Sequence, residues 1–139
     1  MALEFTTLNW VAVIVAAVAG GVVGAIWYAG PLFGNRWADS VGAKPMTMSS
    51  MMTPKIAIGA IVMPLVMAYV LTLFIGGMAI TTLVNGAIVG FLAALGFSAM
   101  AALNAFVYDG RNMTWLGITV GYQFLTLVVM GGVIGYLGA

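Results

Sequence analysis

The sequence predicts an all-α integral membrane protein, a four-transmembrane-helix bundle with one interfacial, cytoplasmic loop. Hydrophobic residues make up 64% of its 139 residues and charged residues only 5%, whereas an average soluble domain is about 25% charged. A soluble domain of this size needs a polar surface, because a small body has much surface per volume. Four basic and three acidic residues cannot provide that surface. We therefore expect a single membrane domain, 1–139, whose surface faces lipid.

The first predicted span covers about residues 8–29. It lies in a stretch without charged residues over 5–35, and a helix needs about 20 apolar residues to cross the hydrocarbon core. Trp10 near its start and Trp27 near its end fit the aromatic belts at the two membrane interfaces. Pro31 then ends the span, because proline does not continue a helix.

A polar loop over 31–53 follows the first span. It contains Arg36, Asp39 and Lys44. Aromatic and apolar residues in its first half predict that this half lies along the membrane interface. The loop ends at Thr53-Pro54, which predicts the start of the next helix, since Thr is a good N-cap and Pro fits the first turn.

The next stretch, 56–108, contains no charged residue and is too long for one span. As a single helix it would extend about 80 Å, against a hydrocarbon core of roughly 30 Å. It therefore predicts a hairpin of two spans, near 54–76 and 80–107. Gly76-Gly77 is the favoured break, and Asn85-Gly86 is a second candidate turn.

The last predicted span covers about 114–136, after a turn at 109–112. All four Lys and Arg residues fall in or beside the first and third loops. By the positive-inside rule these loops are cytoplasmic and both termini lie outside. We expect the protein in the inner (plasma) membrane of a bacterium.

Rows of small residues at four-residue spacing predict where the helices pack. Such rows let two backbones approach closely, which replaces the hydrophobic drive that lipid removes. They serve contacts either within one chain or between copies. The predicted packing residues are Ala12, Ala16, Gly20, Gly24, Gly86, Gly90, Ala94, Gly117, Gly121, Gly131 and Gly135.

Polar residues near the end of the third span and in the fourth predict a small cluster beneath the cytoplasmic surface. Ionisable residues deep in a membrane mark proton and ion paths, and no predicted span has one. The cluster is either a ligand pocket or simple hydrogen bonding between helices. Its residues are Asn104, Tyr108, Asp109, Arg111, Tyr122 and Gln123. Other polar residues within the spans are Asn85, Ser98, Thr119 and Thr126.

Several classes of function are excluded by composition. The chain has no Cys and no His, which removes thiolate chemistry, zinc sites and imidazole catalysis. It has no run of basic residues, which argues against a nucleic-acid partner. We expect no enzyme activity, no catalytic residues, no cofactor and no metal site.

Eleven Met residues raise one metal alternative. Thioethers bind Cu(I), and Met63 and Met67 lie four residues apart, as ligand pairs do in copper channels. Four more crowd the loop at Met46, Met48 and Met51-Met52. Met is also a common filler of apolar packing, so copper transport stays a minor alternative.

Two stretches, 9–37 and 103–135, resemble the membrane family called domain of unknown function 1761. The resemblance lies in Asn-Trp at the start of the first span, a Trp-Tyr-x-x-x-Phe-Gly-x-x-Trp pattern at its end, and an Asn, an acid and a base closing the third. The residues in this chain are Asn9, Trp10, Trp27, Tyr28, Phe33, Gly34, Trp37, Asn104, Asp109, Arg111, Gly121, Tyr122, Met130 and Gly131. Asp109 stands where the family usually has Glu. The resemblance implies a small multi-span membrane protein and brings no established activity.

The leading functional hypothesis is a protein that works through helix packing. It would be a homo-oligomer or an accessory subunit, whose partners are the lipid bilayer and either its own copies or another membrane protein. The alternative is a small transporter or channel for an ion or small solute. The polar cluster and Pro64, which should kink the second span, indicate that alternative.

Overall fold

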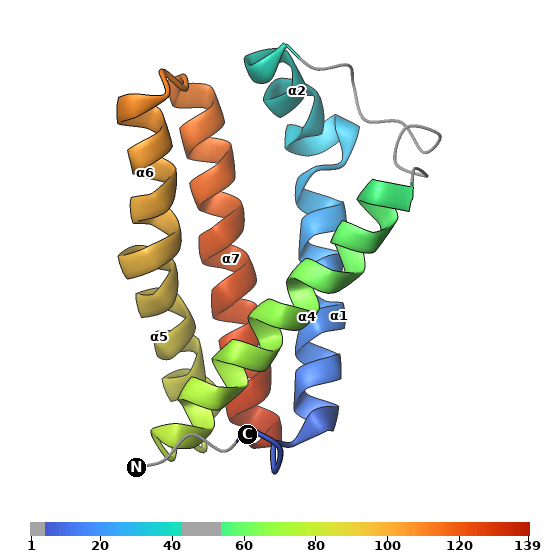
Figure 1. The fold of residues 1–139 in the computed structure, drawn as a ribbon, viewed down its shortest axis with the longest axis vertical. Helices are drawn as coiled ribbons and strands as arrows, with labels where there is room; N and C mark the ends of the chain where they lie inside the picture. Colours follow the sequence, from blue (N-terminus) through green and yellow to red (C-terminus); the bar gives the residue numbers. More distant parts are fainter. Residues whose placement is uncertain (1–4, 43–53) are drawn as a thin grey trace.

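The computed structural model describes residues 5–42 and 54–139. In these residues four helices are long and apolar enough to cross a membrane, and no strand is present, which confirms the predicted fold class. They are α1 (Trp10–Trp27), α4 (Pro54–Gly77), a continuous helix over Leu83–Tyr108 and α7 (Met113–Leu137). The third consists of α5 (Leu83–Ala93), a π-helical turn η2 (Ala94–Ser98) and α6 (Ala99–Tyr108) (Figure 1).

The region predicted as a polar loop is partly helical, which corrects that prediction. A π-helical turn η1 (Gly30–Gly34) and a short helix α2 (Asn35–Val41) follow α1 almost without a break. Pro31 falls in the first turn of the new helix, where its missing N–H costs nothing, so it begins a helix as well as ending one. Gly42, at φ 70°, ends α2 by donating to the carbonyls of Ala38 and Asp39. Residues 43–53, with Lys44 and four of the Met residues, lie outside the described parts.

The connection between the second and third spans follows Gly77, where α4 ends. Asn85-Gly86, the other candidate turn, lies inside α5. Thr82 provides the N-cap of α5, its hydroxyl accepting a hydrogen bond from the backbone N–H of Asn85 at 3.2 Å.

Helix α7 is the centre of the bundle, with α1 on one side and α5 on the other (Figure 1). The approach of α5 is closest at Gly86, Gly90 and Gly131. A Cβ added to Gly90 would collide with the carbonyl oxygen of Leu127, and one added to Gly131 with that of Gly86. Only glycine allows two helix backbones to lie this close. Helix α4 crosses obliquely over α1 and α7.

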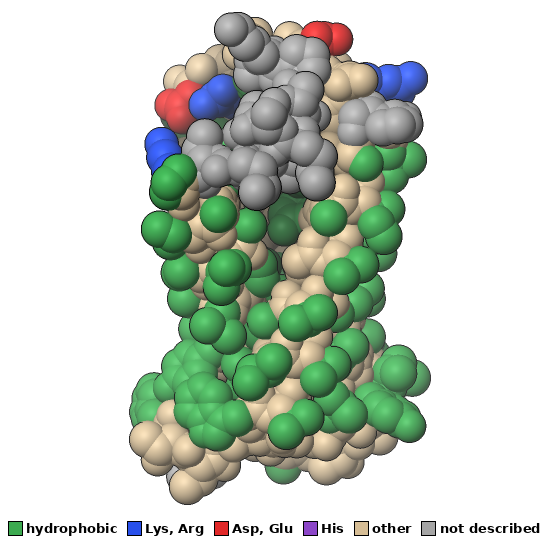
Figure 2. All heavy atoms as spheres, turned by 90° about the vertical axis from the view of Figure 1, so that its right-hand side faces the viewer, with side chains coloured by type: hydrophobic (Ala, Val, Ile, Leu, Met, Phe, Trp, Pro, Cys, Tyr) green, Lys and Arg blue, Asp and Glu red, His purple; other side chains and the backbone are tan. Residues whose placement is uncertain are grey.

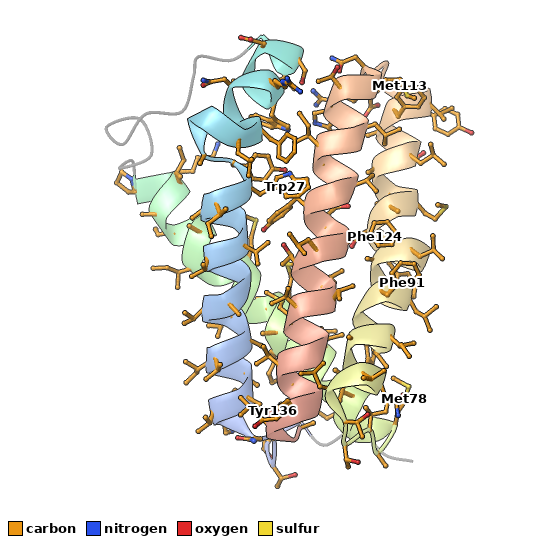
Figure 3. All side chains as sticks on the ribbon, turned by 180° about the vertical axis from the view of Figure 1, so that it is seen from behind. Trp27, Met78, Phe91, Met113, Phe124 and Tyr136 are labelled. Atoms are coloured by element: carbon orange, nitrogen blue, oxygen red, sulfur yellow. The ribbon has the colours of Figure 1, made fainter. Side chains whose placement is uncertain are left out.

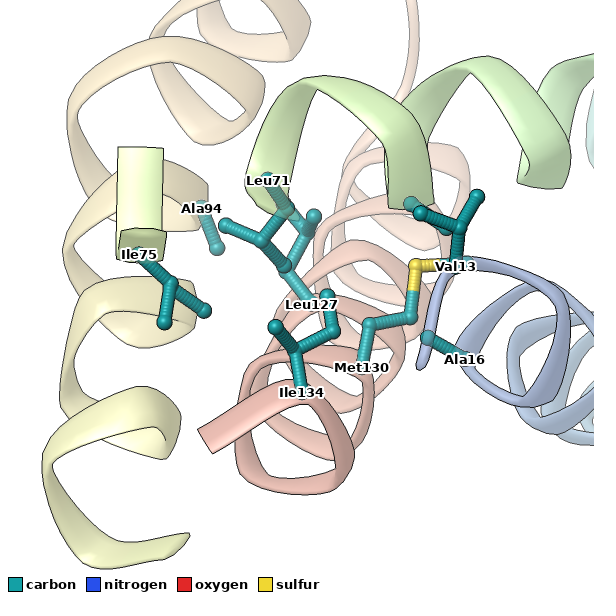
Figure 4. Packing of buried hydrophobic residues seen from close by; sticks show 9 residues of the cluster. Val13, Ala16, Leu71, Ile75, Ala94, Leu127, Met130 and Ile134 are labelled. Atoms are coloured by element: carbon teal, nitrogen blue, oxygen red, sulfur yellow. The ribbon is translucent and has the colours of Figure 1, made fainter. Parts of the chain in front are cut away.

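Apolar side chains fill the half of the bundle near the chain termini. Met130 and Ile134 of α7 are fully buried against α4 and α1 (Figure 4). The buried cluster consists of Val13, Ala16, Ala68, Leu71, Ile75, Ala94, Leu127, Met130 and Ile134. At the same end, Asn9 Nδ2 donates to the Gly138 carbonyl at 2.7 Å and joins the start of α1 to the end of α7.

On the face that Figure 2 shows, the surface is apolar along the helices, and the charged side chains that the structure describes gather at one end. Large side chains such as Ile61 at 68% exposure and Phe97 at 74% point away from the bundle. The described charged residues lie at the end where α2 and the turn between α6 and α7 meet, as Figure 2 shows; we call this the charged end. An apolar belt with charges at one rim is the surface expected of a bundle in lipid.

Candidate functional site

The six residues of the predicted polar cluster fall into two groups that face different directions. Asn104, Tyr108, Asp109 and Arg111 are exposed, Tyr108 to 81%. Tyr122 and Gln123 are partly buried, and the Tyr122 ring lies against Gly24 of α1. The prediction groups these residues because they are close in the sequence. In the structure, the helical period directs the side chains at the end of α6 away from the bundle.

Charge pairs do not organise this end either. In the parts of the chain that the structure describes, no Lys or Arg nitrogen lies within 4.0 Å of an Asp or Glu oxygen. The Arg111 guanidinium carbon lies 5.4 Å from the ring centroid of Trp115 instead. This cation–π contact is worth about 0.5–1 kcal/mol at an exposed site.

Most of the predicted packing residues are used inside the chain. Ala12, Ala16 and Ala94 are fully buried. Gly20 lies against Met130 and Thr126, and Gly121 lies against the ring of Trp27. Gly86, Gly90, Gly131 and Gly135 form the close contact between α5 and α7. Gly117 alone among the predicted glycines faces open space, with nothing within 4 Å of an added Cβ.

An aromatic group fills the space between α1, α2 and α7 near the charged end. Trp27 points from the end of α1 toward α7 (Figure 3), where its Nε1 donates to the Ile118 carbonyl at 3.0 Å. Ring centroids are separated by 4.5 Å between Trp27 and Phe33 and by 5.1 Å between Tyr28 and Tyr122. Trp37 meets Tyr28 edge-on at 5.8 Å. Rings therefore bridge the helices where their backbones separate.

A row of polar side chains extends from this aromatic group into the bundle. Thr119 Oγ1, Gln123 Oε1 and Thr126 Oγ1 are buried, and none meets a partner at full hydrogen-bond geometry among the described residues. Thr119 lies next to Tyr28, close enough for their side chains to interact as hydrogen-bonding neighbours, so the two oxygens of the row that have no such neighbour are those of Gln123 and Thr126. Positions i, i+4 and i+7 share one face of a helix, so we call these three residues the polar row.

The polar row stops halfway through the bundle. At about 1.5 Å per residue, Thr126 lies roughly 20 Å along α7 from its first residue. One turn further, the side chain of Met130 fills the space at Gly20 and joins the apolar cluster. The interior therefore changes from polar to apolar near its middle, and the polar part is nearer the charged end.

A second feature at the charged end is an open hollow between α2 and the start of α7. It has a volume of about 610 Å³ and is lined by Arg36, Asp39, Ser40, Asn112 and Thr114. We call it the polar hollow. The sequence does not predict the polar hollow, because it predicts a loop where the structure has α2. The residue that could have indicated this helix is Pro31, since proline is as typical of a helix start as of a helix end.

The described residues offer no conventional metal site. They contain no group of three or more His, Cys, Asp or Glu side chains that could hold an ion. Met63 is 62% exposed on α4 and Met67 is partly buried, so this pair does not line one enclosed site.

The fold and these features define the class of protein: a helical membrane protein with four spans, polar inside one half and apolar inside the other. The chain belongs to the family described as "Protein of unknown function (DUF1761)", whose sequence profile matches residues 11–135. This confirms the family resemblance. No curated protein and no solved structure matches the chain.

Proposed function

We propose that this protein is a small non-enzymatic transporter that takes a small polar solute between α1 and α7 from the charged end. The observation that carries the proposal is the polar row on one face of α7, in which the buried oxygens of Gln123 and Thr126 have no partner. Leaving a buried polar group unpaired costs about 1–3 kcal/mol. Valine would fill the position of Thr126 without that cost. A ligand that hydrogen-bonds to these oxygens gives a reason for the polar side chains.

The arrangement of the two halves supports the same proposal. Polar side chains reach the middle of the bundle from one end, and the apolar cluster closes the other. Transport then requires two movements: the aromatic group must admit the solute at the charged end, and the apolar half must open. Helix α4 crosses that half, and it carries Pro64 within it, where the missing hydrogen bond permits bending. The π-helical turn η2 lies in the facing helix, and such turns are frequent at functional sites.

Osmotic swelling of proteoliposomes tests the proposal with several small polar solutes, so the natural solute need not be known in advance. Liposomes with and without the protein are shocked with glycerol, urea, erythritol or acetamide, and re-swelling is followed by light scattering. We expect the protein to accelerate entry of at least one solute. Thr126→Val and Gln123→Leu should each reduce that acceleration about tenfold. Thr72→Val is the matched control, because its buried hydroxyl already donates to the Ala68 carbonyl at 2.7 Å.

Two results would contradict the proposal. One is re-swelling that matches empty liposomes for every solute. The other is an equal loss in Thr126→Val and Thr72→Val, because a general effect on packing would then explain both.

Self-association, or service as an accessory subunit, is the second candidate. The glycine rows that suggested self-association mostly contact other helices of the same chain. Another observation must therefore support this candidate. That observation is an apolar groove of about 440 Å³ beside α7, lined in part by Val15, Ala87, Val128 and Gly132. A helix from another copy or another protein would cover it. Native mass spectrometry from mild detergent should then detect a complex, and Gly132→Leu should abolish it; a lone monomer in both would contradict this candidate.

A further inference from the structure

We infer that the polar hollow binds a zwitterion, a group that carries one anionic and one cationic centre. Arg36 and Asp39 supply the two complementary charges, and the Thr114 hydroxyl supplies a further hydrogen-bonding group. The hollow lies outside the polar row, so the inference does not depend on the proposed transport.

The walls of the hollow are held by hydrogen bonds that leave those groups available. Asn112 Nδ2 donates to the Ser40 carbonyl at 2.6 Å and ties α2 to the start of α7. Asn112 Oδ1 accepts from the Trp115 backbone N–H at 2.8 Å. Ser40 Oγ donates to the Trp37 carbonyl at 2.7 Å. Asn112 and Ser40 are thus engaged in shaping the hollow.

The two charges that line the hollow do not neutralise each other. Arg36 and Asp39 are three residues apart on α2, a spacing at which opposite charges often pair. No ion pair within 4.0 Å joins them or any other charges in 5–42 and 54–139. A simple anion would meet Arg36 but also the carboxylate of Asp39, and a simple cation would meet the reverse. A zwitterion satisfies both charges at once.

The position of the hollow allows two sources for this ligand. It lies at the charged end, between α2 and the start of α7, where the helices leave the apolar belt. Phospholipid headgroups occupy this level of a membrane, and dissolved zwitterions reach it from water. The shared chemistry is a phosphate or carboxylate for the guanidinium and an ammonium for the carboxylate.

The experiment uses the full-length protein in nanodiscs made only of phosphatidylglycerol, which has no cationic centre. Phosphoethanolamine is titrated by calorimetry to detect a dissolved zwitterion. In a second arm, nanodiscs contain one-fifth phosphatidylethanolamine, and lipids retained by the released protein are counted by native mass spectrometry. Variants are Arg36→Gln and Asp39→Asn. Arg111→Gln is the control, because Arg111 packs over Trp115 and does not line the hollow.

Binding in either arm supports the inference if each hollow variant weakens it about tenfold or more and Arg111→Gln does not. Signal only in the first arm identifies a dissolved zwitterion, signal only in the second identifies the lipid headgroup, and signal in both shows that the hollow accepts this chemistry from either source. Exchanging the two charges, Arg36→Asp with Asp39→Arg, should recover part of the binding. No binding in either arm, or equal binding by wild type and both single variants, overturns the inference. Gln123→Leu should bind the zwitterion as the wild type does, because Gln123 does not line the hollow. Binding in the hollow is therefore tested independently of the proposed transport.

Discussion

The half of the bundle near the chain termini and the half near the charged end are held together by different means. In the first, backbones meet at glycines such as Gly86 and Gly131, and an apolar cluster seals the interior. In the second, the rings of Trp27, Tyr28 and Tyr122 bridge helices that lie farther apart. The buried polar row occurs on the segment of α7 from the aromatic group to the middle of the bundle.

The two kinds of packing indicate that the terminal half carries stability and that the charged half is free to carry function. Close backbone packing tolerates almost no change, because native interiors are dense and each added atom must displace another. Filling the interior with aromatic and polar side chains stabilises the bundle less, since each unpaired buried oxygen costs free energy. We therefore expect substitutions in the terminal half to unfold the protein and substitutions in the charged half to alter what it binds.

The largest effect should come from closing the glycine contact. Gly131→Ala places a Cβ into the carbonyl oxygen of Gly86, and the free energy of unfolding should fall by about 3 kcal/mol. Gly117→Ala is the matched control on the same helix, because it enters open space and should gain up to about 1 kcal/mol from helix propensity. Unfolding in mixed micelles, followed by circular dichroism, measures both. Equal midpoints would show that α5 and α7 do not meet as described.

The next effect should come from the apolar cluster. Met130 is fully buried, and Met130→Ala leaves a cavity beside Gly20 that should cost about 2 kcal/mol. Met100, at 48% exposure on α6, faces lipid, and Met100→Ala should change the same unfolding midpoint very little. If the two variants were equally stable, the terminal half would not be the stable half.

The sequence is sufficient to predict the four spans because hydropathy and bilayer thickness set their length. Helix α7 is predicted at 114–136 and observed at Met113–Leu137. The short helix α2 is not predicted, because Pro31 and Gly34 indicate the end of α1. In the structure the backbone passes through a π-helical turn there and continues. A proline cannot by itself distinguish the end of one helix from the start of another.

The candidate site is only partly predictable. The sequence identifies Gln123 and Tyr122 but groups them with Asn104 and Tyr108, which are exposed. It places Thr119 and Thr126 among the polar residues of the spans without assigning them to a site. The relative rotation of α6 and α7 decides these groupings, and it depends on contacts between residues far apart in the sequence. Hydropathy carries no information about that rotation, because most sides of each helix are apolar.

A smaller effect should appear in the charged half, and with the opposite sign. Thr126→Val removes a buried hydroxyl that has no partner, so stability without solute should rise by up to about 1 kcal/mol. Thr72→Val removes a satisfied hydroxyl and should lose about 0.6 kcal/mol. Unfolding midpoints measured in solute-free detergent compare the two. A loss in Thr126→Val equal to that in Thr72→Val would mean that Thr126 is satisfied and that the polar row is structural.

The most local effect should separate the two tasks of Asn112. Its Oδ1 caps α7 at the Trp115 N–H, and its Nδ2 holds the Ser40 carbonyl of α2. Asn112→Asp keeps the acceptor and loses the donor, so α7 should stay capped while α2 is released. Asn112→Ala loses both and should cost about 1 kcal/mol more in stability. Hydrogen exchange should therefore accelerate over 35–41 in both variants, but over 113–117 only in Asn112→Ala. Unchanged exchange at 35–41 in Asn112→Asp would show that α2 is held by its aromatic contacts, chiefly Trp37 on Tyr28, and not by the tether.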